Sequence, residues 1–77
     1  MVLKIISPER VLYQGEVESV TLPGALGLFM VLKDHAPLVS ALAPGSVVYI
    51  AGGTEHAQVV ERGMVEVRDN EVVVCTG

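Results

Sequence analysis

The sequence predicts an all-β domain, a sandwich or barrel of about 8–10 short strands with little or no helix. Short apolar runs broken by Gly, Pro or Asp-Asn recur along the chain at the spacing typical of such folds. No window places apolar residues at i, i+3, i+4 and i+7, as an amphipathic helix would. Valine dominates the apolar residues, and β-branched side chains favour strands. The 77 residues favour a single domain spanning 1–77.

Proline and glycine mark where the strands of the first half should begin and end. Pro8 lacks an N–H and favours a turn over Ser7–Arg10. Gly15 lies inside an expected strand, where glycine often marks a bulge or a bend, and Val17 is out of phase with Leu12 and Val20. Pro23-Gly24 is expected to break that run, and Gly27 to let the chain enter the next strand. The expected strands are Val2–Ile6, Val11–Leu22 with an interruption at Gly15, and Leu28–Leu32.

Turn residues divide the second half into regular segments. Pro44-Gly45, Gly52-Gly53 and Asp69-Asn70 predict turns, since Gly, Asp and Asn tolerate positive φ. A loop is expected at 33–36. The expected extended segments are Pro37–Ala43, Ser46–Ala51, Glu55–Glu61, Met64–Arg68, where Val65 and Val67 share one face, and Glu71–Cys75.

Charge and composition exclude several classes of partner. The net charge is −4, and the five Lys and Arg residues are scattered. Nucleic-acid binding and docking on anionic lipid both need clustered basic residues, so neither is expected. No apolar run approaches the roughly 20 residues of a membrane span, and the N-terminus does not resemble a signal peptide. We therefore expect a soluble chain without direct membrane insertion.

No pattern in the sequence predicts catalysis or a cofactor. The possible metal ligands His35, His56 and Cys75 lack the spacing of a metal site. Ser40 and Cys75 lack the surroundings of an activated nucleophile. Gly24–Gly27 lacks the Lys-Ser/Thr of a phosphate-binding loop, and no helix is expected after it. These observations predict no metal, no cofactor and no enzymatic activity.

The segment from Leu22 to Leu38 is the most informative part of the chain. A turn explains its glycines, but not the apolar residues in and beside that turn, Ala25, Leu26 and Leu28. Exposed apolar residues of this kind commonly mark a partner contact. Burial between the sheets of a sandwich is the alternative, and the sequence alone leaves both open.

Several segments, in this order, resemble the N-terminal β-sandwich domain of the epsilon subunit of F-type ATP synthases. They are Leu3–Val17, Ser19–Gly24, Gly27, Phe29, Val31-Leu32, His35–Leu38, Pro44-Gly45 and Gly63–Val72. The resemblance implies a flattened sandwich of about ten short strands, which is a common number of strands for β-sheets. It places this domain in the central stalk. It also implies a non-catalytic rotor subunit that couples proton-driven rotation to ATP synthesis. Its location would be peripheral, on the cytoplasmic face of the bacterial inner membrane.

The resemblance also implies two contact surfaces on the domain. One faces the ring of membrane rotor subunits, the c-ring, and the other faces the gamma subunit; further catalytic-sector subunits complete the expected partners. The c-ring-facing loop would comprise Gly24, Ala25, Leu26, Gly27, Leu28 and Phe29. The gamma-facing segment would comprise His35, Ala36, Pro37, Leu38, Ser40 and Ala41.

The chain departs from the family pattern in three respects. Many members carry an acidic residue where Leu28 stands, and many have Pro-Gly where this chain has Lys33-Asp34. The second change introduces charges that could pair with the ring loops. Typical members continue into a pair of C-terminal helices, whereas this chain stops at Gly77. Its start at Met1 favours a naturally short subunit over an excised domain.

The sequence also leaves two other functions open. A lipoyl- or biotinyl-type carrier domain would need a modifiable lysine at a hairpin tip, and only Lys33 lies in a loop. A small-ligand-binding barrel would need a lined cavity, which a domain of this size can hardly spare.

Overall fold

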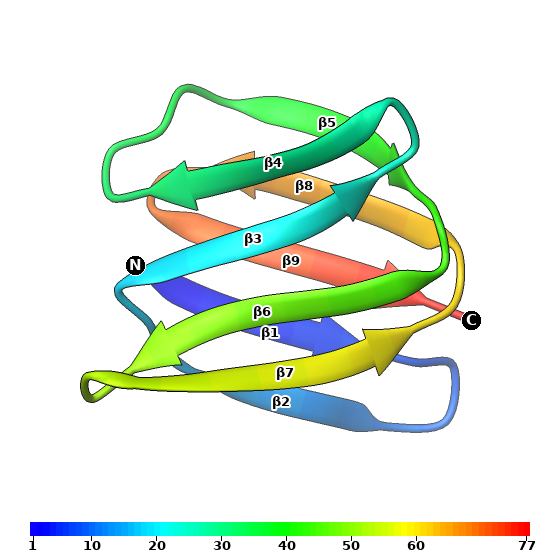
Figure 1. Ribbon diagram of the computed structural model, residues 1–77, viewed down its shortest axis with the longest axis horizontal. Coiled ribbons are helices and arrows are strands. Elements are labelled where there is room, and N and C mark those ends of the chain that lie inside the picture. Colours follow the sequence, from blue (N-terminus) through cyan, green and yellow to red (C-terminus); the bar gives the residue numbers. More distant parts are fainter.

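The computed structural model describes residues 1–77 as nine strands without a helix, which confirms the all-β prediction. Two layers of strands face one another, with β3, β4, β6 and β7 in front in Figure 1. The strands are β1 Val2–Ile6, β2 Val11–Glu16, β3 Ser19–Gly24, β4 Gly27–Leu32, β5 Leu38–Leu42, β6 Gly45–Ala51, β7 Thr54–Val60, β8 Gly63–Arg68 and β9 Glu71–Thr76.

Strand pairing defines the two layers. One has the order β2-β1-β9-β8-β5 and the other β4-β3-β6-β7. They join where Gly24 of β3 pairs with Leu42 of β5. All pairs are antiparallel except β1 with β9, which run parallel. The domain measures 26 × 23 × 19 Å.

The core lies between the layers and consists largely of valine. Alternation along each strand sends every second residue inward. Val20, for example, pairs with Val31 on one side and Tyr49 on the other, and all three are buried. Val65 and Val67 share one face as predicted, and that face is buried, while Met64, Glu66 and Arg68 are exposed. The buried apolar residues are Leu3, Ile5, Val17, Val20, Leu22, Val31, Leu42, Val47, Tyr49, Val60, Val65, Val67, Val72 and Val74.

The predicted interruption at Gly15 is wrong. Gly15 pairs with Leu3 inside β2, and the register shift of the β1–β2 ladder lies elsewhere, between Ile5 and Ile6, where Leu12 of β2 has no partner. The chain leaves the strand only at Val17 and Glu18, where it crosses from one layer to the other. The register shift at Leu12 and this crossing together account for Val17 being out of phase with Leu12 and Val20.

The predicted break at Pro23-Gly24 is also wrong, because β3 continues through Gly24. Pairing of β3 with β6 ends at Thr21, and proline is tolerated towards the end of a strand ladder. Gly24 does not have a positive φ. It must be glycine because a Cβ there would lie 2.6 Å from the carbonyl oxygen of Gly27. The turn itself consists of Ala25 and Leu26.

The predicted turns at Gly52-Gly53 and Asp69-Asn70 are confirmed. Both central residues of each have positive φ, between 52° and 75°. That geometry matches the twist of the flanking strands in a two-residue hairpin. Asp34 also has a positive φ of 62°, which the sequence had not indicated.

The two lateral openings of the sandwich differ. Between β2 and β7, an aromatic cluster fills the opening. The ring of Tyr49 lies 4.4 Å from that of Tyr13 and 5.3 Å from that of His56, measured between centroids. Burial, and the proximity of Tyr13, raise the pKa of the Tyr49 hydroxyl above its ordinary value. On the opposite side, β4 and β5 do not pair with one another and leave an opening.

Candidate functional site

The turn expected to face the c-ring projects from the end of the β3–β4 hairpin. Leu26 is fully exposed, and Leu28 is 76% exposed on the outer face of β4. Gly27 has φ 132°, which favours glycine. Burial was the alternative reading for these apolar residues, and the structure excludes it for Leu26 and Leu28. Phe29 instead points inward and packs against the core.

The segment expected to face gamma lies along the opening between β4 and β5. A groove of about 350 Å³, here called the β4–β5 groove, occupies this opening. It is lined by Phe29, Met30, His35, Leu38, Val39 and Ser40. The structure thus brings Phe29, assigned to the ring-facing loop, together with three residues of the gamma-facing segment.

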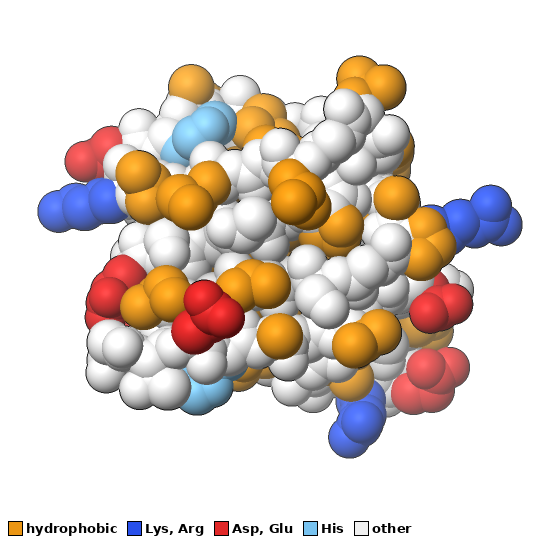
Figure 2. All heavy atoms as spheres, in the orientation of Figure 1, with side chains coloured by type: hydrophobic (Ala, Val, Ile, Leu, Met, Phe, Trp, Pro, Cys, Tyr) orange, Lys and Arg blue, Asp and Glu red, His pale blue; other side chains and the backbone are white.

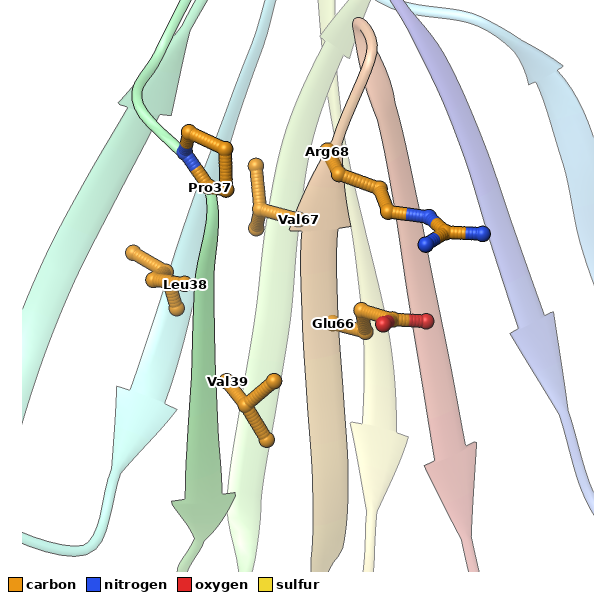
Figure 3. Close-up of a pocket in the computed structure, with 6 residues that line it drawn as sticks. All are labelled: Pro37, Leu38, Val39, Glu66, Val67 and Arg68. Atoms are coloured by element: carbon orange, nitrogen blue, oxygen red, sulfur yellow. The ribbon is translucent and has the colours of Figure 1, made fainter.

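A second groove lies on the other side of β5. This β5–β8 groove has a volume of about 340 Å³ and is lined by Pro37, Leu38, Val39, Glu66, Val67 and Arg68. Figure 3 shows Pro37, Leu38 and Val39 beside the three residues of β8. Leu38 and Val39 line both grooves, so β5 forms a ridge between them. The two β8 residues Glu66 and Arg68 give the second groove charges of both signs.

Backbone hydrogen bonds connect the two expected contact surfaces. The Ala25 N–H donates to the Ala41 carbonyl oxygen at 2.9 Å, and the Ala43 N–H donates to that of Pro23 at 2.9 Å. The ring-facing turn is therefore held directly against the C-terminal end of β5. His35 and Ala36 lie before β5, at its opposite end.

Side-chain hydrogen bonds keep the polar groups of the gamma-facing segment local. Ser40 Oγ donates to the Ala41 carbonyl oxygen at 3.0 Å. His35 Nδ1 lies 2.7 Å from the Ala36 carbonyl oxygen. Because a carbonyl oxygen can only accept, a hydrogen bond here requires the tautomer with the proton on Nδ1. The lining of the β4–β5 groove is therefore apolar, apart from one imidazole and one hydroxyl.

The outer face of the β4-β3-β6-β7 layer is also rich in exposed apolar residues. Figure 2 shows hydrophobic side chains spread over this face, with the charged side chains mostly at its margins. Leu28, Met30 and Leu32 project outward from β4, and Val59 projects from β7. Of these, only Leu28 was assigned to a site from the sequence. The i, i+2 spacing of Leu28, Met30 and Leu32 was the available signal.

The sequence assignment missed Val39, which is 64% exposed and lines both grooves.

No group of three or more His, Cys, Asp and Glu residues is placed to hold a metal ion. Cys75 is free and exposed, and His56 is exposed beside Tyr49. No helix of the chain is long and apolar enough to cross a membrane.

Comparison with known proteins gives a consistent result over the whole chain. The family model for the ATP synthase delta/epsilon chain β-sandwich domain matches residues 1–77. The ATP synthase epsilon chain of Leptospira interrogans is 42% identical over 74 residues, with 96% of this chain and 58% of that protein covered. The epsilon chain of Leptospira borgpetersenii is 45% identical over 75 residues, with the same coverage. The chain therefore spans little more than half the length of the curated relatives it matches.

A solved structure shares the fold. One chain of the cryo-EM structure of the Euglena gracilis mitochondrial ATP synthase, containing OSCP, F1 and c-ring, superposes with a TM-score of 0.91 at 26% identity. The match covers 99% of this chain and 49% of that one.

Proposed function

Because this chain belongs to the ATP synthase delta/epsilon β-sandwich family, we propose that it works as a central-stalk subunit of an F-type ATP synthase. In this role it binds the gamma subunit and the c-ring, and couples proton-driven rotation to ATP synthesis. It carries out no bond chemistry itself. It is a peripheral component on the cytoplasmic face of a bacterial inner membrane, in contact with the catalytic sector.

The observation that carries this proposal is the direct connection between the two contact surfaces. A rotor subunit must transmit force from one partner to the other without deforming. Ala25 in the ring-facing turn donates to Ala41 of the gamma-facing segment, and Gly24 pairs with Leu42. Force applied at one surface therefore reaches the other through backbone hydrogen bonds, which a densely packed core supports.

The gamma subunit is proposed to occupy the β4–β5 groove and the β5 ridge. Leu38, Val39, Phe29 and Met30 supply the apolar area that a stable interface needs. His35 and Ser40 provide the few polar groups that fix orientation. The unpaired edges of β4 and β5 offer backbone hydrogen-bonding groups to a partner.

The proposal is tested by co-expressing the chain with the gamma subunit of the same organism, followed by size-exclusion chromatography. A stable one-to-one complex supports the stalk role and shows that this β-sandwich is sufficient for binding. Two folded proteins that elute separately would contradict it.

The ring contact is tested with Leu28→Lys. The side chain is exposed on the outer face of β4, so the variant should keep the fold and its free energy of unfolding within about 0.5 kcal/mol. We expect its binding to a detergent-solubilised c-ring, measured with the gamma complex, to weaken about tenfold, since an apolar contact becomes a charge. Val59→Lys is the matched control, because it makes the same apolar-to-lysine change at an exposed position of β7, the strand at the opposite edge of the same layer. Undiminished ring binding by Leu28→Lys would remove this residue from the contact.

A further inference from the structure

A reciprocal pair of hydrogen bonds joins the β4–β5 loop to the β8–β9 turn. The backbone N–H of Asp34 donates to Asn70 Oδ1 at 2.7 Å, and Asn70 Nδ2 donates to Asp34 Oδ1 at 2.9 Å. The two residues are 36 positions apart in the sequence. No other pair of side chains in the chain is hydrogen-bonded to one another.

The backbone of Asp34 makes this pairing informative. The His35 N–H donates to the Leu32 carbonyl oxygen at 3.2 Å, which closes a four-residue turn with Asp34 in its third position. Asp34 has φ 62°, and the third position of a turn with positive φ strongly favours glycine. Positive φ costs aspartate conformational free energy that glycine would not lose, and the hydrogen bonds to Asn70 offset this cost.

Asn70 lies in a turn whose own position is held by the surrounding strands. It lies in a tight two-residue hairpin turn with φ 58°. Its carbonyl oxygen accepts a hydrogen bond from the Val2 N–H at 3.0 Å, which ties the turn to the start of β1. The strands on either side, β8 and β9, lie inside their layer and are paired on both edges.

The loop itself has little other attachment. It crosses from the end of β4 in one layer to the start of β5 in the other, and Lys33 and Asp34 are exposed. His35, which follows Asp34 directly, lines the β4–β5 groove. The conformation of Asp34 therefore determines where the imidazole and the segment leading into β5 are placed.

We propose that Asp34 and Asn70 form a positioning clasp, which orders the β4–β5 loop before the partner binds and so sets the affinity of the β4–β5 groove. That the partner is the gamma subunit rests on the proposed function. Without the clasp, the loop must be ordered at the moment of binding, and that cost appears as lost affinity. Neither residue needs to touch the partner.

Glycine substitutions remove the clasp without straining the backbone. Asn70→Gly keeps a residue that favours the left-handed turn and removes both hydrogen bonds. Asp34→Gly keeps the turn and removes only the bond made by the carboxylate. Asp69→Gly is the matched control, because Asp69 has φ 52° in the same turn and makes no side-chain hydrogen bond.

The first measurement is amide hydrogen exchange by NMR on the wild-type chain and the three variants. Loss of a typical hydrogen bond corresponds to about a tenfold change in an equilibrium constant. We therefore expect the Asp34 amide to exchange about tenfold faster in Asn70→Gly, with a smaller increase at residue 34 in Asp34→Gly. Asp69→Gly should leave this rate unchanged. Equal rates in Asn70→Gly and Asp69→Gly would overturn the clasp.

The second measurement is the affinity for the gamma subunit. Asn70→Gly should raise the Kd about five- to tenfold while Asp69→Gly does not, as expected when the cost of ordering moves to the binding step. The double variant of residues 34 and 70 should be no weaker than Asn70→Gly alone, since both act through one contact. Faster exchange with unchanged affinity would overturn the positioning role. Failure of the wild-type chain to bind gamma would instead overturn the proposed function, and exchange would still show whether the clasp orders the loop.

Discussion

Gly63→Ala is expected to lower the free energy of unfolding by about 3 kcal/mol or more, because a new methyl group would collide with backbone. Gly63 opens β8 and pairs with Leu42 on one side and Thr76 on the other. A Cβ at this position would lie 1.9 Å from the carbonyl oxygen of Cys75. No change of rotamer can relieve that contact, so β8 and β9 must separate locally.

Urea denaturation followed by far-UV circular dichroism measures this loss. A domain of this size has a total stability of only about 4–12 kcal/mol, so the loss removes a large fraction of it and should lower the urea concentration at the unfolding midpoint markedly. Gly15→Ala is the matched control, because it makes the same change inside β2. Its Cβ would meet no backbone atom but only the end of the Tyr13 side chain, with the hydroxyl oxygen at 2.8 Å and Cζ at 3.2 Å. A Gly63→Ala protein as stable as Gly15→Ala would show that the two strands have room to move apart.

The two glycines illustrate what the sequence could and could not predict about the fold. Strand positions and hairpin turns follow from local patterns, and Asp69-Asn70 is a case in which residue type alone gives the turn geometry. The demand for glycine at position 63 comes from a strand twelve residues further along the chain. At Gly15 the sequence predicted a local bend, whereas the irregularities lie on either side of it, at the register shift at Leu12 and at the crossing between layers at Val17 and Glu18.

The candidate site was predictable to a similar extent. The composition of the β3–β4 turn indicated apolar residues that a turn does not need, but it left open whether they are exposed or buried. The inward direction of Phe29 does not follow from composition, because it depends on the pairing of Phe29 with buried Leu22. Likewise, the sequence could not predict that Val39 lines the groove, because this depends on β5 lying at the edge of its layer. The charge introduced at Asp34 was expected to meet a partner, but its carboxylate is hydrogen-bonded to Asn70.

Ser40→Arg is expected to weaken gamma binding about a hundredfold, a loss of about 3 kcal/mol, while leaving the fold intact. Ser40 pairs with the buried Val65, and residues opposite one another share a face, so its side chain points towards the opening between the layers. It lines the β4–β5 groove together with Leu38 and Phe29. An arginine there fills the groove and places a charge in an apolar interface with no carboxylate among the residues that line it.

The fold should tolerate this change because the long side chain can reach solvent through the open edge of the sandwich. Ser46→Arg is the matched control, since it makes the same substitution at an exposed strand position of β6, in the other layer. Titration calorimetry with the gamma subunit should give a wild-type Kd for Ser46→Arg and a strongly raised one for Ser40→Arg. If both variants bind like the wild type, the gamma subunit does not enter the groove. The β5–β8 side of β5, with its opposite charges at Glu66 and Arg68, would then be the surface to mutate next.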